Sequence, residues 1–113
     1  MANPKVYIPN KGCHDFSTAE MFGELIFLTT GKFNLLSIGR MYRTFQPIVD
    51  ASSNEDYILV CGPSVMASIL CSLFAIKHNC LNLLLYSASQ NGVGKYKVRN
   101  IIFDPQQMEE VEL

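Results

Sequence analysis

The sequence contains few charged residues. Lysine, arginine, aspartate and glutamate together make up 17% of the 113 residues, whereas about 25% is usual for a soluble domain. Hydrophobic residues make up 49%, and the formal net charge is −1. A general nucleic-acid binder or a membrane-surface protein would need a basic excess, which is missing here. The small charged fraction instead indicates that the helices are heavily buried or that part of the surface contacts another subunit.

The sequence also lacks long apolar runs and paired cysteines. The longest apolar run, SVMASILCSLFAI, is too short to span a bilayer and is interrupted by serines. No signal peptide is predicted, because residues 1–5 lead directly into a strand. The four cysteines, Cys13, Cys61, Cys71 and Cys80, form no CxxC motif. We therefore expect reduced thiols, no membrane association and a cytoplasmic location.

Motifs that would identify an enzyme are missing as well. The chain has neither GxGxxG nor GxxxxGK[ST], the glycine-rich loops that hold nucleotide phosphates. It has two histidines, too few to favour a metal site in the absence of a cysteine cluster. No metal or cofactor and no catalytic residue is predicted, and the sequence favours a protein that is not an enzyme.

Hydrophobic periodicity divides the chain into strands and helices. The predicted strands cover residues 5–9, 24–29, 56–62, 81–87 and 95–103, and the predicted helices cover 17–22, 37–49 and 63–79. One continuous helix over residues 17–30 is the alternative for the first part. Gly23 and the β-favouring segment IFLTT count against that alternative.

Local sequence signals predict where the first helix begins and ends and which aromatic residues of the second helix are buried. Ser17 and Glu20 have the spacing of a capping box, with Asp15 as the alternative cap, and Gly23 is expected to end the helix in a left-handed conformation. On the second helix an aromatic pair within GRMYRTF lies on the apolar stripe. We expect this pair, Tyr42 and Phe45, in the core rather than on an RNA-binding surface.

The third helix has two faces of different character. One is bulky and the other is formed by small residues; the bulky face comprises Val65, Met66, Ile69, Leu70, Leu73 and Phe74, and the small one Ala67, Ser68, Cys71, Ser72 and Ala75. A face of small residues allows another backbone to approach closely. Together with the low charge, this face predicts a homo-oligomer.

The last strand has a different pattern. Lys95, Lys97 and Arg99 alternate along it, as charged residues do on a protected edge strand. Binding of nucleic acid through these side chains is the alternative, and it would be steeply dependent on salt. The dipeptide Asn91-Gly92 predicts a turn before this strand.

The order of elements indicates an α/β domain. A β-α-β-α-β-α-β-β order predicts three layers of the Rossmann-like or flavodoxin-like kind, with a mostly parallel sheet and an antiparallel edge strand. The predicted domain covers residues 1–104, and residues 105–113 form an acidic C-terminal tail.

A candidate site follows from this architecture. Ligands of open parallel sheets bind beyond the carboxyl ends of the strands, where NKGCHDF, TGKFN and GPS would lie. The candidate ligand-binding residues are Asn10, Lys11, His14, Asp15, Lys32, Arg40 and Ser64. The basic members would attract an anion, and Ser64 opens a helix whose N-terminus can hold one. The competing interpretation of residues 10–17 is a bend that joins a strand to a helix.

Four segments carry a resemblance to known proteins. VYIPNKGCHDFSTAEMFGELIFLTTG, MYRTF, DYILVCG and LNLLLY resemble small uncharacterised proteins encoded by tailed bacteriophages, over residues 5–103. The resemblance implies an accessory protein in the host cytoplasm that binds a host protein or a nucleotide signal. It carries no functional residue over to this chain.

Two functional hypotheses remain. The first is a non-enzymatic accessory protein that binds a host or phage macromolecule, with inhibition as one mode of action, and that forms a homo-oligomer. The second is a binder of, or enzyme for, a nucleotide or other anionic small molecule at the carboxyl edge of the sheet. Neither nucleic acid nor a membrane is an expected partner.

Overall fold

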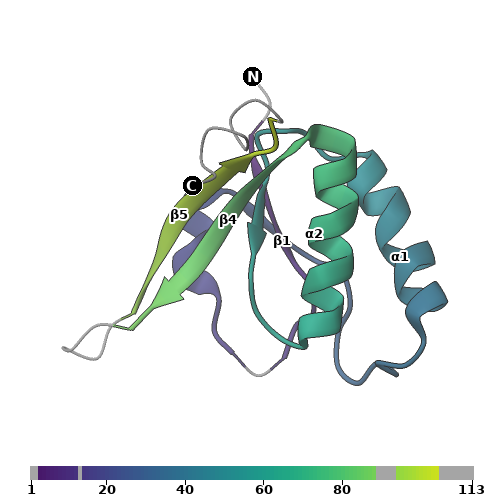
Figure 1. The fold of residues 1–113 in the computed structure, drawn as a ribbon. Helices are drawn as coiled ribbons and strands as arrows, with labels where there is room; N and C mark the ends of the chain where they lie inside the picture. The colour runs from purple at the N-terminus through teal and green to yellow at the C-terminus, as the bar shows by residue number, and fades with distance from the viewer. Residues whose placement is uncertain (1–2, 13, 89–93, 105–113) are drawn as a thin grey trace, which may run out of the picture.

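The computed structural model describes residues 3–12, 14–88 and 94–104. Its elements follow the predicted order (Figure 1); their bounds are β1 Lys5–Ile8, η1 Ser17–Phe22, β2 Glu24–Phe27, α1 Ile38–Asp50, β3 Tyr57–Leu59, α2 Ser64–His78, β4 Cys80–Ser87 and β5 Lys95–Ile102. The separate η1 and β2 exclude the alternative of one helix over residues 17–30. The predicted Asn91-Gly92 turn and the acidic tail lie outside the described residues.

The strands form one sheet of five in the order β2-β1-β3-β4-β5. The four strands β2, β1, β3 and β4 are parallel, and β5 runs antiparallel to β4 at the edge. This confirms the mostly parallel sheet with an antiparallel edge strand. The chain moves outward from β1 to β2, then crosses back to β3 on the other side of β1. The loops that follow β1 and β3 therefore leave the same edge of the sheet side by side.

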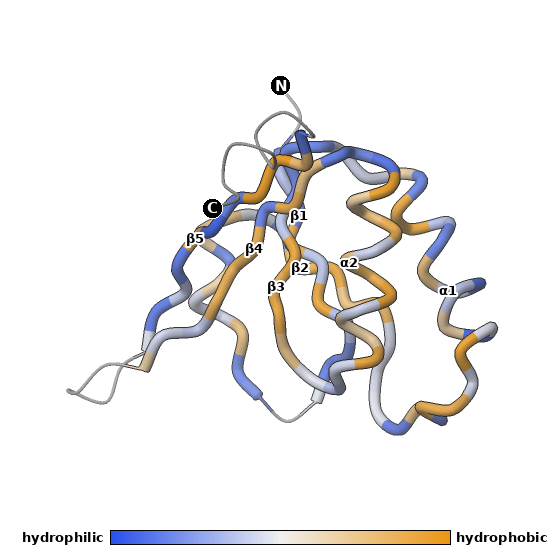
Figure 2. Tube along the Cα trace, viewed as in Figure 1, coloured by the Kyte–Doolittle hydropathy of each residue, from blue (hydrophilic) through white to orange (hydrophobic). Residues whose placement is uncertain are grey.

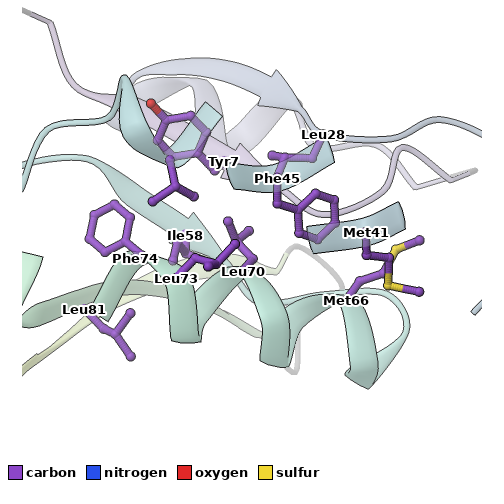
Figure 3. Packing of buried hydrophobic residues seen from close by; sticks show 11 residues of the cluster. Tyr7, Leu28, Met41, Phe45, Ile58, Met66, Leu70, Leu73, Phe74 and Leu81 are labelled. Carbon is purple, nitrogen blue, oxygen red and sulfur yellow. The ribbon is translucent and has the colours of Figure 1, made fainter. Parts of the chain in front are cut away.

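The two faces of the sheet are covered unequally. Helices α1 and α2 pack against each other and cover one face, while the short η1 lies on the other (Figure 1). The larger core cluster lies under the two helices, and Figure 3 shows its side chains; the buried members are Tyr7, Leu28, Met41, Phe45, Val49, Ile58, Met66, Leu70, Leu73, Phe74 and Leu81. The smaller cluster lies on the η1 face and comprises Val6, Ile8, Phe16, Ala19, Leu59 and Leu84. Hydrophobic residues accordingly lie along the central strands and along α2 (Figure 2).

The first helix differs from its prediction in two respects. It is a 3-10 helix, and its N-cap residue, Phe16, makes no side-chain cap hydrogen bond, so the predicted Ser17–Glu20 capping box is wrong. The alternative cap, Asp15, accepts a hydrogen bond from the backbone N–H of Ser17, the first residue of the helix, and so fixes the bend before it. Gly23 does end the helix, but in an extended conformation rather than a helical left-handed one. A Cβ atom at Gly23 would overlap the carbonyl oxygen of Pro4, so close backbone approach requires glycine there.

The buried stripe of α1 is narrower than the sequence predicts. Met41, Phe45 and Val49 are buried, as expected. Tyr42, however, is 50% exposed, so its predicted place in the core is wrong. Successive residues on a helix point about 100° apart, and α2 covers only the side of α1 that Phe45 and Met41 share.

Helix α2 matches its prediction closely. Four residues of its bulky face are buried, and Asn79 ends it in the left-handed conformation. Its small-residue face is used partly within the chain, because Cys71 and Ala75 pack against the larger core cluster. Ser68 and Ser72 remain exposed. The homo-oligomer therefore stays a prediction, and the inward-packed small residues already have an intramolecular reason.

The amino edge of the sheet is fixed by one buried carboxylate. Asp56 is 3% exposed. It accepts hydrogen bonds from the backbone N–H of Lys5 at 2.9 Å, the hydroxyl of Tyr7 at 3.0 Å and the backbone N–H of Ser53 at 2.8 Å. Burial and the neighbouring Asp56 carboxylate raise the pKa of Tyr7 far above its usual range, so this phenol stays a donor. Asp56 thus joins β1 to the turn that leads into β3.

Candidate functional site

A hollow of about 400 Å³ lies beside the carboxyl ends of β1 and β3. It opens where the strand order reverses, the place where open α/β sheets bind ligands. Its walls come from the loop after β1, the end of β3 and the β4–β5 pair; the described lining residues are His14, Asp15, Phe16, Leu59, Val60, Cys61, Tyr86 and Tyr96. The volume falls within the range of small-molecule pockets.

Backbone pairing holds the loop after β1 in place. The N–H of Lys11 donates to the carbonyl of Thr29 at 2.8 Å, and Lys11 forms an isolated bridge with Thr30. The side chain of Asn10 donates to the carbonyl of Gly31 at 3.1 Å. Asn10 therefore fastens this loop to the loop after β2, and residues 10–12 extend the parallel sheet before the chain turns into the hollow.

The loop presents two polar side chains on an aromatic base. His14 and Asp15 are exposed, and Phe16 beneath them is buried. Phe16 packs against Phe27 of β2 with ring centroids 5.9 Å apart, and His14 lies edge-on to Phe16 at 6.1 Å. The backbone hydrogen bond from Ser17 lowers the pKa of Asp15, so this carboxylate is charged at neutral pH.

The opposite wall is formed by a tyrosine pair. Tyr86 and Tyr96 face each other across β4 and β5 with ring centroids 5.4 Å apart. Gly94 makes room for Tyr86, since a Cβ atom at Gly94 would overlap the phenol ring. Burial, together with Cys61, Tyr86 and Asp15, raises the pKa of Tyr96. Burial also raises the pKa of the Cys61 thiol, so both groups are uncharged at neutral pH.

The predicted site residues do not all meet at this hollow. His14 and Asp15 line it, whereas the other five candidates are not among its described lining residues; they are Asn10, Lys11, Lys32, Arg40 and Ser64. The ammonium of Lys11 lies over the Phe27 ring at 5.2 Å, and the guanidinium of Arg40 lies over the Phe33 ring at 4.8 Å. Lys11 and Arg40 thus each contact a different aromatic ring, and neither is a described lining residue of the hollow.

Sequence reasoning missed the aromatic and thiol lining of the hollow. Phe16 and Cys61 were visible as residues that flank the ends of strands. Tyr86 and Tyr96 belong to different predicted strands, and only the register of the β4–β5 pair places them opposite each other. The available signal was that each tyrosine lies near the turn that joins the two strands.

A second cluster, at the C-terminal ends of α1 and α2, has a structural role. The Ser52 hydroxyl lies 2.7 Å from Nε2 of His78, but it donates to the carbonyl of Val49 at 2.5 Å and is buried. A nucleophile would need an accessible hydroxyl whose proton is directed at the imidazole. The ammonium of Lys77 donates to the carbonyls of Val49, Asp50 and Ser52 and so caps α1.

The described part of the chain holds neither a metal-type side-chain cluster nor a helix that could span a membrane. Over residues 3–12, 14–88 and 94–104, no three side chains of histidine, cysteine, aspartate or glutamate lie close enough to share a metal ion. Within the same ranges, no helix has the length and hydropathy needed to cross a membrane.

The sheet, its two helices and the open hollow define a small α/β domain with a ligand-sized cavity at its carboxyl edge. A family model described as "Phage Pam3 gp32-like protein" matches residues 4–100. The chain therefore belongs to this family of phage proteins, which confirms the resemblance drawn from the sequence. The comparison with curated proteins gives no match.

Proposed function

We propose that the protein is a non-enzymatic accessory protein of the phage that binds another protein through β5, in the host cytoplasm. The observation that carries this proposal is the outer edge of β5, where no other described strand pairs; one strand carbonyl, that of Val98, accepts a hydrogen bond from the Arg99 guanidinium at 2.7 Å. The strand is eight residues long and, within the described chain, pairs with β4 alone. An exposed strand of this length offers a row of backbone groups to which an extended segment of another protein can add as a further strand.

The side chains of β5 indicate the chemistry of the partner. Lys97 and Arg99 project from one face, opposite Leu85 and Leu83 of β4, and are exposed. Two copies of β5 would bring like charges together, which is unfavourable across paired strands. An extended segment with acidic residues at alternating positions would place opposite charges there. Ile102, 64% exposed at the end of the strand, adds an apolar contact.

The fold itself does not decide between binding and a reaction. The strand order is that of flavodoxin-like sheets, and we propose this assignment for the fold. Such sheets host many activities, so the assignment names no chemistry. The alternative function, binding or conversion of a nucleotide or other anion, is less well supported. Its basic candidates Lys11 and Arg40 lie over aromatic rings, away from the hollow.

Site-specific cross-linking in infected host cells tests the proposal. A photoreactive residue is placed at Ile102 on β5 and, as the matched control, at Tyr42, which is exposed on α1. We expect cross-links from position 102 to an acidic segment of one protein and none to that protein from position 42. The double variant Lys97→Glu, Arg99→Glu should abolish the cross-links.

Three outcomes would refute this function. One is the absence of specific cross-links at position 102, and another is cross-linking that the two charge reversals leave unchanged. The third is a cross-link to nucleic acid whose yield falls steeply with salt. That last result would establish the alternative interpretation of the basic residues on β5.

A further inference from the structure

We propose that the hollow between the β1 loop and the Tyr86–Tyr96 pair binds a planar aromatic ring that carries N–H donors and is uncharged or cationic. This inference goes beyond the proposed protein partner and does not depend on it. The basic side chains of β5, Lys97 and Arg99, project from the face opposite to Tyr96, because successive residues of a strand alternate between faces.

The shape of the hollow favours a flat ligand. One wall is the Tyr86–Tyr96 pair and the other is Phe16 with His14 edge-on to it. Aromatic side chains from separate segments therefore border a cavity of about 400 Å³, which is large enough to admit a substituted ring. Aromatic faces attract further rings in offset or edge-to-face arrangements, and they attract cations as well.

The charge of the hollow selects among flat ligands. Among the described lining residues, Asp15 is the carboxylate, while the partly buried Cys61 thiol and the Tyr96 phenol remain protonated. A carboxylate accepts two N–H donors from an amidine-like or amino-substituted ring edge. The same carboxylate repels phosphate and carboxylate groups, and the ammonium of Lys11, which is not among the described lining residues, lies over Phe27. His14 also lines the hollow, and it can accept a further N–H donor through its unprotonated ring nitrogen. A ring with donors therefore matches the lining groups.

A charge series on one ring tests the inference. Benzamidine, benzamide and benzoate present the same ring with a positive, neutral and negative substituent. Binding to the full chain is measured by saturation-transfer NMR and by protein-observed titration up to millimolar concentrations. We expect affinities in the order benzamidine, benzamide, benzoate, with benzamidine ahead of benzamide by about twofold to fivefold, the range for an exposed ion pair.

Two variants separate the contribution of the Asp15 charge from that of the Tyr86 ring. Asp15→Asn keeps an oxygen that can accept the Ser17 N–H, so the loop is preserved while the charge is lost. It should remove the preference for benzamidine over benzamide. Tyr86→Ala, at a residue 59% exposed, should weaken all three probes without unfolding the protein. Thermal denaturation of each variant confirms that it is folded.

A control variant on β5 separates ring binding from the proposed protein interface. Lys97→Glu with Arg99→Glu should leave ring binding unchanged, which separates this site from the proposed protein interface. The inference is overturned if no probe binds, if benzoate binds as tightly as benzamidine, or if folded Tyr86→Ala binds all three like the unmodified protein. Cross-linking at β5 could still succeed in each of these cases, so the two proposals fail independently.

Discussion

The buried carboxylate of Asp56 gives the sharpest quantitative prediction. Replacing it with alanine removes the acceptor of the Lys5 N–H, the Tyr7 hydroxyl and the Ser53 N–H. Each hydrogen bond to a charged group contributes about 1.5–3 kcal/mol. The three share one acceptor, so their losses are not additive. We expect Asp56→Ala to lower the free energy of unfolding by about 4 kcal/mol, because three donors, partly or fully buried, lose their acceptor at once.

Urea unfolding measures this change, with Tyr7→Phe as the matched variant. Tyr7→Phe removes one of the three donors and no acceptor, so it should cost about 1.5 kcal/mol. The double variant should cost no more than Asp56→Ala alone, since the phenol has already lost its acceptor in that variant. The slope of the transition should stay unchanged if only stability is altered.

Two results would refute this reasoning. A loss below about 1 kcal/mol for Asp56→Ala would mean that water replaces the carboxylate at little cost, contrary to its burial. Strictly additive costs for Tyr7→Phe and Asp56→Ala would mean that the two groups do not interact. The 3.0 Å contact between them would then have no energetic consequence.

Three further predictions concern packing, capping and pH. Phe45→Ala should lower the free energy of unfolding by about 3–5 kcal/mol because it leaves a cavity under the helices, while Tyr42→Ala on the same helix should change it by less than about 1 kcal/mol; urea unfolding compares the two. Lys77→Met should cost about 1–2 kcal/mol because the α1 carbonyls lose their donor, whereas Lys32→Met at an exposed loop should cost less than about 0.5 kcal/mol. The folded state raises the pKa of Tyr7, so the unfolded chain ionises first and stability should fall as pH rises above about 10; unfolding measured from pH 7 to 11 should show a smaller fall for Tyr7→Phe.

The helices and strands were predictable because the local sequence signals agree with the tertiary packing. Helix α2 has a wide apolar stripe, a proline before it and Asn79 after it, and each signal indicates the same bounds. The basic alternation of β5 likewise predicted an edge strand, and β5 is one. Agreement among independent local signals is what makes a sequence specify one structure.

Other features depend on contacts that spacing does not encode. Tyr42 lies on the apolar side of α1 by periodicity, yet it is half exposed because α2 covers only part of that side. A capping box needs a suitable backbone as well as suitable side chains, and the bend fixed by Asp15 gives Ser17 a different geometry. At the site, the carboxyl-edge rule placed His14 and Asp15 correctly in space. It could not indicate that Lys11 would lie over Phe27.

The short η1 has a consequence for which residues around the hollow can change. Most of the buried side chains lie under α1 and α2, in the larger cluster. On the opposite face, the six-residue helix η1 is the helix that covers the smaller cluster in the described chain. The exposed lining residues His14, Asp15 and Tyr86 can therefore change with little effect on the packing that stabilises the domain, whereas Phe16 and Leu59 belong to the smaller cluster. The chemistry of the hollow and the stability of the scaffold are thus set by largely separate residues.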